Sequence, residues 1–213
     1  MTQSNRRKFL KNASTVGAGL AASFGAQRAA GAASKKVTLA ILGANSRGPQ
    51  LIQHLSPLKD YEITYICDPD DNARAKGMKA VAKFGGKAPK AIKDFRKALE
   101  DPALDAVLIA APDHWHTPAA LMALDAGKHA YVEKPCGHNP REGELLVEAA
   151  GRQDKLVVSM GSQRRSSPMF MEAIDAIHNG IIGRAYHAKC WYANKRGPIG
   201  NGQKIAPPDT LDW

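Results

Sequence analysis

The stretch VTLAILGANSRG at residues 37–48 joins a continuous apolar run to a turn that contains two glycines. An unbroken apolar run is typical of a strand that is buried on both faces, as the strands of parallel sheets are. The turn matches the pattern G-x-G-x-x-G except at Asn45, which stands where the pattern has its second glycine. The stretch therefore predicts the first strand and the first turn of a doubly wound α/β sheet.

The rest of the chain continues an alternation of apolar runs and helical segments, which predicts a parallel sheet with helices on both faces. The expected strands are residues 37–42, 61–67, 88–92, 105–111, 130–132 and 156–160. The expected helices are residues 48–58, 70–84, 94–99, 117–126, 140–153 and 168–178. Residues 184–192 alternate as an antiparallel strand would, and the stretch 194–213 is rich in Gly and Pro and suits a linker.

The first 34 residues resemble an export signal rather than a folded segment. Arg6 and Arg7 precede a short run of small and apolar residues at 13–26, which is typical of a twin-arginine signal and predicts a periplasmic location. The run is too short and too rich in Ala and Gly to predict a stable membrane anchor. The alternative is an amphipathic or disordered basic tail.

Half of the basic excess lies in that leader. It holds five basic residues and no acidic one, so the formal net charge of +10 falls to +5 in the remainder. The remainder has no block of Lys and Arg interleaved with aromatic residues, which argues against nucleic-acid binding. Cys67, Cys136 and Cys190 make an odd count without C-x-x-C spacing, which argues against a disulfide scaffold and against a zinc site. No metal ligand set is predicted.

The glycine-containing turn is a candidate site for the pyrophosphate of a dinucleotide. Gly43, Ser46 and Gly48 would bring backbone N–H groups and the N-terminus of the next helix to the phosphates, and Arg47 would add positive charge. Asn45 weakens the pattern, although Asn tolerates unusual backbone angles and its amide can donate a hydrogen bond. The alternative is an ordinary turn between a strand and a helix.

Asp68 follows the second expected strand, 25 positions after Gly43. A carboxylate in this place accepts hydrogen bonds from the adenosine ribose and repels the extra phosphate of NADP, so it predicts NAD as the cofactor. The alternative is that Asp68 caps the next helix.

The loop at residues 111–116 follows another strand and is expected at the same edge of the sheet. Ala111, Pro112, Trp115 and His116 are predicted to line the cofactor site, in preference to a catalytic role for the histidine. The alternative for the histidine is a bond to the local backbone.

Lys134 is the candidate catalytic residue. It stands in the sequence Glu133-Lys134-Pro135 at the end of the fifth expected strand, where side chains point into the ligand crevice of a parallel sheet. An amine beside a positively charged nicotinamide ring, and partly removed from water, would act as an acid or base for a hydroxyl. The peptide bond before Pro135 is a candidate for the cis form. The alternative is a surface turn with an ion pair.

On these residues the chain resembles the Gfo/Idh/MocA family, which is named for glucose-fructose oxidoreductase, inositol dehydrogenase and a rhizopine-catabolism protein. The most specific part of the match is residues 111–116, 126–129 and 133–135, in order and in spacing. The resemblance implies a Rossmann domain at 35–162 and, at 163–213, the start of an α/β domain with a large open sheet. It also implies a tightly held nicotinamide cofactor and possible assembly of copies through the second domain.

The resemblance assigns further roles. It places Lys134 near the reacting hydroxyl, Glu133 beside the cofactor and Gln163 at the nicotinamide carboxamide. An aspartate and a histidine that such proteins use from the second domain have no matching motif before Trp213. Candidate substrate contacts in the 163–213 part are Arg164, Trp191 and Tyr192.

The predicted activity is hydride transfer between a hydroxyl of a sugar, polyol or glycoside and the nicotinamide cofactor. One alternative, also implied by the resemblance, is glycoside hydrolysis through transient oxidation, elimination and return of the hydride. A second alternative is a non-catalytic protein that binds a nucleotide or a sugar.

Overall fold

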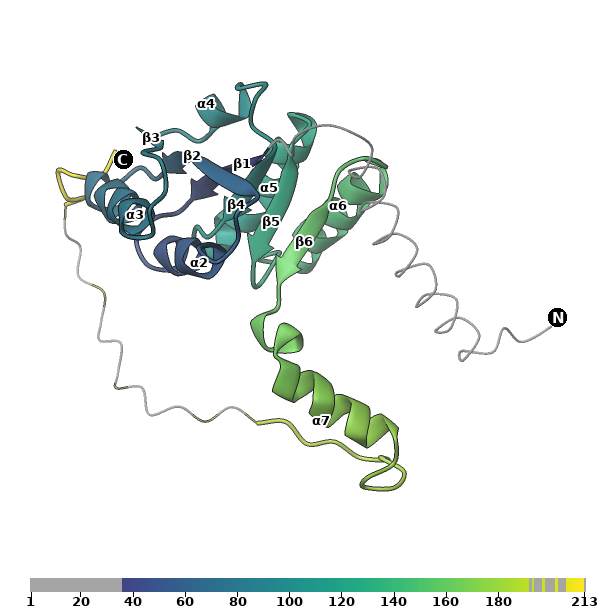
Figure 1. The fold of residues 1–213 in the computed structure, drawn as a ribbon. Coiled ribbons are helices and arrows are strands. Elements are labelled where there is room, and N and C mark those ends of the chain that lie inside the picture. The colour runs from purple at the N-terminus through teal and green to yellow at the C-terminus, as the bar shows by residue number, and fades with distance from the viewer. Residues whose placement is uncertain (1–35, 192, 194–196, 198–201, 203–205, 213) are drawn as a thin grey trace, which may run out of the picture.

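The computed structural model describes residues 36–191, 193, 197, 202 and 206–212, so the expected signal at 1–34 and the candidate contact Tyr192 lie outside the described residues. A six-stranded sheet has the order β3-β2-β1-β4-β5-β6, and every neighbouring pair is parallel (Figure 1). The strands are β1 Val37–Leu42, β2 Tyr61–Cys67, β3 Lys90–Ile92, β4 Ala106–Ile109, β5 His129–Glu133 and β6 Val158–Gly161. This order, with its reversal beside β1, confirms the predicted Rossmann sheet.

Helices α2 to α6 join successive strands, and α7 follows the last strand. They are α2 Arg47–Leu55, α3 Asp71–Lys83, α4 Arg96–Leu99, α5 His116–Asp125, α6 Pro140–Gly151 and α7 Pro168–His178, with short 3-10 turns η1 Asp113–Trp115 and η2 Gln163–Ser166. All six expected helices are present, and the bounds of the last agree with the prediction. None of the helices in the described part of the chain is long and apolar enough to cross a membrane.

The sheet separates two apolar layers, and β1 shows how the sequence supplies both. Leu39 and Ile41 pack with the cluster that contains residues of α2 and α3, whereas Ala40 and Leu42 pack with the cluster of α4, α5 and α6. Successive side chains of a strand point to opposite faces, so an unbroken apolar run buries residues on both sides. Ile41 is fully buried.

Two helix starts have clear local causes. The side chain of Asp70 accepts a hydrogen bond from the Asn72 N–H and caps α3, and the Asn139 side chain caps α6 by accepting from the Glu142 N–H. Both side chains satisfy an N–H group that has no partner inside the helix. The caps fix where the chain turns from the carboxyl edge of the sheet into each helix.

The structure corrects one expected element. Residues 184–191 form no strand. Alternation of side chains is only half of what a strand needs, because its N–H and C=O groups also require a neighbouring strand. No other strand pairs with this segment within the described residues.

The last described segment, residues 206–212, returns to the sheet. Leu211 forms an antiparallel bridge with Asp70, the Asp71 N–H donates to the Thr210 carbonyl, and the Asp212 N–H donates to the Pro69 carbonyl. Figure 1 shows this yellow segment beside α3, whereas α7 extends away from the sheet domain.

Candidate nucleotide-binding site

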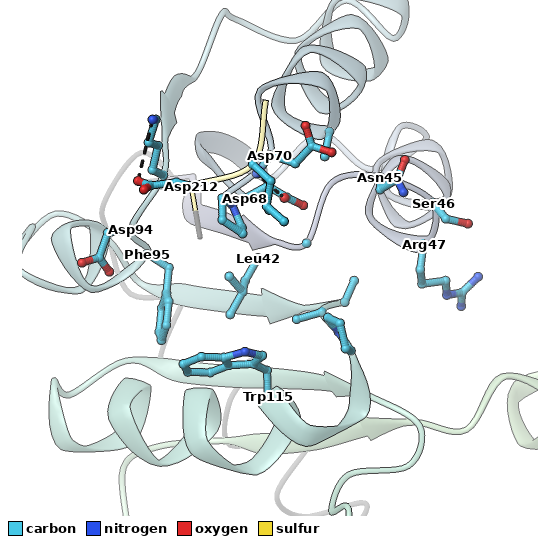
Figure 2. Close-up of a pocket in the computed structure, with 18 of the residues that line it drawn as sticks. Leu42, Asn45, Ser46, Arg47, Asp68, Asp70, Asp94, Phe95, Trp115 and Asp212 are labelled. Atoms are coloured by element: carbon cyan, nitrogen blue, oxygen red, sulfur yellow. Dashed lines mark hydrogen bonds and ion pairs between the residues drawn. The ribbon is translucent and has the colours of Figure 1, made fainter. Parts of the chain in front are cut away.

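A cavity of about 870 Å³ lies at the carboxyl edge of the sheet, where the strand order reverses between β1 and β4. Residues that follow β1, β2, β3 and β4 line it, together with two residues of the segment 206–212 (Figure 2). Open α/β sheets bind ligands in this position. The cavity contains most of the predicted cofactor residues, namely Gly43, Asn45, Ser46, Arg47, Asp68, Ala111, Pro112 and Trp115.

The turn after β1 requires its two glycines. Gly43 has a φ of +88°, and a Cβ there would lie 2.6 Å from the carbonyl carbon of Ala110. A Cβ on Gly48 would collide with the Gly43 carbonyl oxygen. Asn45 does not have a positive φ, so this position accepts a side chain, and the Asn45 amide oxygen accepts a bond from Lys76 Nζ at 2.6 Å. The missing glycine is therefore compatible with the turn.

The N-terminus of α2 faces this cavity. Ser46 precedes the helix, but its side chain makes no capping hydrogen bond, and the first turn contains no acidic residue. The first N–H groups of a helix have no partner within it, and the helix dipole favours an anion there. Ser46 and Arg47 line the same end of the cavity. These groups fit a pyrophosphate.

Asp68 ties the second strand to the glycine turn. Its Oδ2 accepts from the Ala44 N–H at 2.8 Å and its Oδ1 from the Asp70 N–H at 3.0 Å. The helix-cap alternative for Asp68 is wrong, because Asp70 caps α3. Each carboxylate oxygen has two lone pairs, so Asp68 keeps acceptor capacity for ribose hydroxyls in the cavity that it lines.

Trp115 lines the cavity, whereas its neighbour His116 does not. The indole of Trp115 lines the cavity and meets the ring of Phe95 edge to face, with 6.3 Å between centroids. His116 is buried and does not line the cavity. Its Nδ1 lies 2.5 Å from the Pro135 carbonyl oxygen and its Nε2 lies 2.8 Å from the Ala111 carbonyl oxygen. His116 therefore bonds to the local backbone, as the alternative interpretation expected, and links the end of β4 to the turn after β5.

Glu133 connects the end of β5 to the glycine turn. It is 4% exposed, and its Oε1 accepts from Arg47 Nε at 2.8 Å. Lys134 follows it and is exposed in this chain, so the expected partial removal from water is not met within the described residues. The Lys134–Pro135 peptide bond is cis, as predicted. Thr117 Oγ donates to the Cys136 carbonyl at 2.7 Å, so α5 holds the turn that carries Lys134.

The candidates after β6 are not gathered at this cavity. Gln163 is exposed with a φ of +45°, Arg164 lies 5.5 Å from the ring centroid of Phe170, and Trp191 is exposed. None of them lines the cavity. Other predicted cofactor residues outside the lining are Gly48, His116, Glu133 and Lys134. The cavity therefore corresponds to the adenosine diphosphate half of a dinucleotide.

The sequence interpretation missed several lining residues. Lys93, Asp94 and Phe95 follow β3, whose carboxyl end lies at the same edge as those of β1 and β2, and this rule could have identified them. Leu211 and Asp212 gave no such signal, because they lie far along the chain. Among the described residues, no group of three or more His, Cys, Asp or Glu side chains is placed to hold a metal ion.

Residues 37–162, more than half of the chain, match the family described as "Oxidoreductase family, NAD-binding Rossmann fold" (GFO_IDH_MocA). The chain belongs to this family. Gly43, the free N-terminus of α2 and Asp68 are the features that fit its NAD cofactor. The predicted family and the predicted Rossmann fold are confirmed.

Curated proteins of similar sequence include glycosyl hydrolases. "Glycosyl hydrolase family 109 protein 2" of Shewanella sp. (strain ANA-3) is 29% identical over 265 residues, which cover 100% of this chain and 58% of that protein. A glycosyl hydrolase family 109 protein of Parabacteroides distasonis is 28% identical, over 89% of this chain and 45% of its own length. The chain thus spans about half the length of these relatives.

Among solved structures, myo-inositol dehydrogenase from Lactobacillus casei, in complex with NAD(H) and myo-inositol, has a TM-score of 0.61 and 27% identity. The match covers 70% of this chain and 43% of that enzyme. Myo-inositol 2-dehydrogenase from Lactobacillus plantarum, with a TM-score of 0.62 and 22% identity, shows the shared fold.

Proposed function

We propose that the protein of which this chain is part transfers hydride between a hydroxyl-bearing carbon of a sugar or polyol and a bound NAD. One observation carries the proposal. The strand β5 ends at Glu133, Lys134 and Pro135 follow it, and the Arg47–Glu133 ion pair joins this strand end to the turn after β1, where Arg47 lines the cavity. Lys134 therefore directly follows a side chain that is bonded to the turn after β1, and this placement supports its role beside the cofactor.

The chemical division of roles follows from this arrangement. When bound, the nicotinamide ring supplies the hydride acceptor and donor. The α2 N-terminus and Arg47 bind the pyrophosphate, and Asp68 accepts bonds from the ribose. The Lys134 amine takes the proton from the substrate hydroxyl during oxidation and returns it during reduction.

Orientation of Lys134 comes from side chains on α5. His116 contacts the Pro135 carbonyl and Thr117 donates to the Cys136 carbonyl, so the backbone on the C-terminal side of Lys134 is held at two points. A positioned proton acceptor gains its effect from fixed geometry, because the amine must reach the hydroxyl within hydrogen-bond distance.

The test uses the full-length protein, NAD and a panel of polyols and sugars. In Lys134→Ala we expect turnover to fall by about a hundredfold or more while the Kd for NAD changes less than about twofold. Lys155→Ala is the matched control, because Lys155 is an exposed lysine before β6, away from the cavity lining. Undiminished turnover in Lys134→Ala contradicts the proposal, as does a wild-type protein without affinity for either dinucleotide.

The names of the two hydrolase relatives favour a second candidate function, glycoside hydrolysis without net redox change. In that reaction a sugar hydroxyl is oxidised, the aglycone is eliminated, water adds and the hydride returns to the same sugar. Product analysis separates the two functions. Release of a monosaccharide from an aryl glycoside with no net NADH indicates hydrolysis, whereas NADH formed in proportion to product indicates oxidation.

We also infer export through the twin-arginine route, on the strength of Arg6, Arg7 and the small apolar run that follows them. Replacement of both arginines by lysine should retain the full-length protein in the cytoplasm, as measured by cell fractionation. Periplasmic recovery of this variant at the wild-type level would contradict export by this route.

A further inference from the structure

One side of the cavity, at the end next to Asp68 where the adenosine is expected, is formed by residues from a distant part of the sequence. Leu211 and Asp212 line the cavity together with Asp68, although more than 140 positions separate the two segments. Backbone bonds hold this side of the cavity in place, because the Asp212 N–H donates to the Pro69 carbonyl at 3.2 Å and the Thr210 carbonyl accepts from Asp71 at 2.9 Å. Pro69 is the neighbour of Asp68, so Asp212 is fixed beside the expected position of the adenosine ribose.

Carboxylates converge on this end of the cavity. Figure 2 shows Asp68, Asp94 and Asp212 around it, with Asn45, Ser46 and Arg47 at the other end. Hydrogen bonds from Arg96 hold the pKa of Asp94 below its ordinary value, so Asp94 remains negative. Three carboxylates thus lie at the end expected for the adenosine, and the N-terminus of α2 and Arg47 lie at the end expected for the pyrophosphate.

The basic residues at the end expected for the adenosine already have partners. Arg96 Nη2 lies 2.7 Å from Asp94 Oδ2, and Lys93 Nζ lies 3.7 Å from Asp212 Oδ2. Arg74 pairs with Asp71 and donates to the Asp68 carbonyl at 2.5 Å. Within the lining, Lys93 is the cation that lies opposite Asp212, and the two side chains are 54% and 59% exposed.

We propose that Asp212 is a specificity residue for the cofactor: it completes the adenosine subsite and selects NAD against NADP. It acts in two ways. Its own charge opposes a phosphate on the ribose 2′-oxygen, and its ion pair with Lys93 offsets part of the positive charge that would attract that phosphate. The inference rests on the proposed function, since it concerns the dinucleotide of the same site.

The experiment measures the Kd of NAD and of NADP for the full-length protein by titration calorimetry. In Asp212→Asn we expect the Kd ratio of NADP to NAD to fall by about tenfold, because one negative charge is lost and one positive charge is released. Asp209→Asn is the matched control, since Asp209 is exposed in the same segment and does not line the cavity. Its ratio should stay within about twofold of the wild-type ratio.

A double variant tests the mechanism. Addition of Lys93→Ala to Asp212→Asn should reverse most of the gain in NADP affinity, because the released ammonium is then absent. A ratio in Asp212→Asn that moves no more than in Asp209→Asn overturns the inference and leaves the proposed function intact. A wild-type protein that binds neither dinucleotide overturns the proposed function, and this inference with it.

Discussion

The sheet domain at residues 37–161 and the segment that follows it, residues 162–191, both contain helices rich in apolar residues. The helices differ in how far these residues are buried. Helix α5 buries His116, Thr117, Ala119, Ala120, Ala123 and Leu124. Helix α7, in contrast, has no buried residue, although it carries Met169, Phe170, Met171 and Ile174. Local pattern therefore determines that a helix forms, whereas its burial depends on what packs against it.

The largest contrast should appear in cysteine reactivity. Cys67 is fully buried in β2, and this burial raises the pKa of its thiol from 9.0 to about 12, which lowers its thiolate fraction by about a thousandfold. Cys190 is exposed in the second region. Iodoacetamide should therefore modify Cys190 at least about a thousandfold faster in the 213-residue chain, as followed by mass spectrometry. Similar rates would show that the sheet opens readily.

Truncation of an isoleucine in each region should give unequal losses of stability. Ile109→Ala removes a fully buried side chain from β4 and should lower the free energy of unfolding by about 3 to 4 kcal/mol. Ile174→Ala, on the exposed face of α7, should change it by less than about 0.5 kcal/mol. Urea denaturation measures both. A large loss for Ile174→Ala in a longer form of the protein would identify a partner that packs on α7.

Glycines can sharpen the comparison within the sheet domain. Gly43→Ala forces a Cβ against the Ala110 backbone at a φ of +88°, so we expect a loss of about 2 to 3 kcal/mol. Gly143→Ala is the control, because it lies inside α6 with nothing within 4 Å of the added Cβ. It should stabilise the protein by about 0.5 to 1 kcal/mol. Equal effects in thermal unfolding would contradict the described turn.

The smallest expected effect concerns helix caps in the two regions. Asn139 caps α6 through its side chain, and Asn139→Ala should cost about 1 kcal/mol. Ser167 precedes α7 without a side-chain cap bond, so Ser167→Ala should change the free energy of unfolding by only a few tenths of a kcal/mol. Chemical denaturation of both variants provides the measurement, and a larger loss for Ser167→Ala would reverse the expected order.

The sequence predicted the sheet because its signals are local. An apolar run such as 37–42, followed by a glycine turn, identifies both a strand and its carboxyl edge, and the edge rule then brought Asp68 and Trp115 to the correct cavity. The strand expected at 184–192 was wrong for its described residues, 184–191, because pairing is not a local property. Alternation showed the pattern of a strand without showing that any neighbour exists.

The site was harder to predict where side chains choose among partners. His116 belongs to a loop at the correct edge, yet its ring turns inward to the Ala111 and Pro135 carbonyls, and spacing alone does not reveal such a choice. Asp212 lies outside every motif, and only the three-dimensional return of its segment brings it to the cavity. Contacts between distant positions of one sequence carry no local signal.

The Arg47–Glu133 pair has a consequence for kinetics. It spans the reversal of the sheet and connects the turn between β1 and α2 with the strand end that precedes Lys134. Removal of either partner breaks this connection and leaves the other charge without its counterion, so Arg47→Ala and Glu133→Ala should each weaken NAD affinity and slow turnover together. Lys134→Ala, by comparison, should slow turnover alone. Steady-state kinetics with direct NAD titration can therefore distinguish a residue pair that affects both cofactor binding and turnover from a residue that affects turnover only.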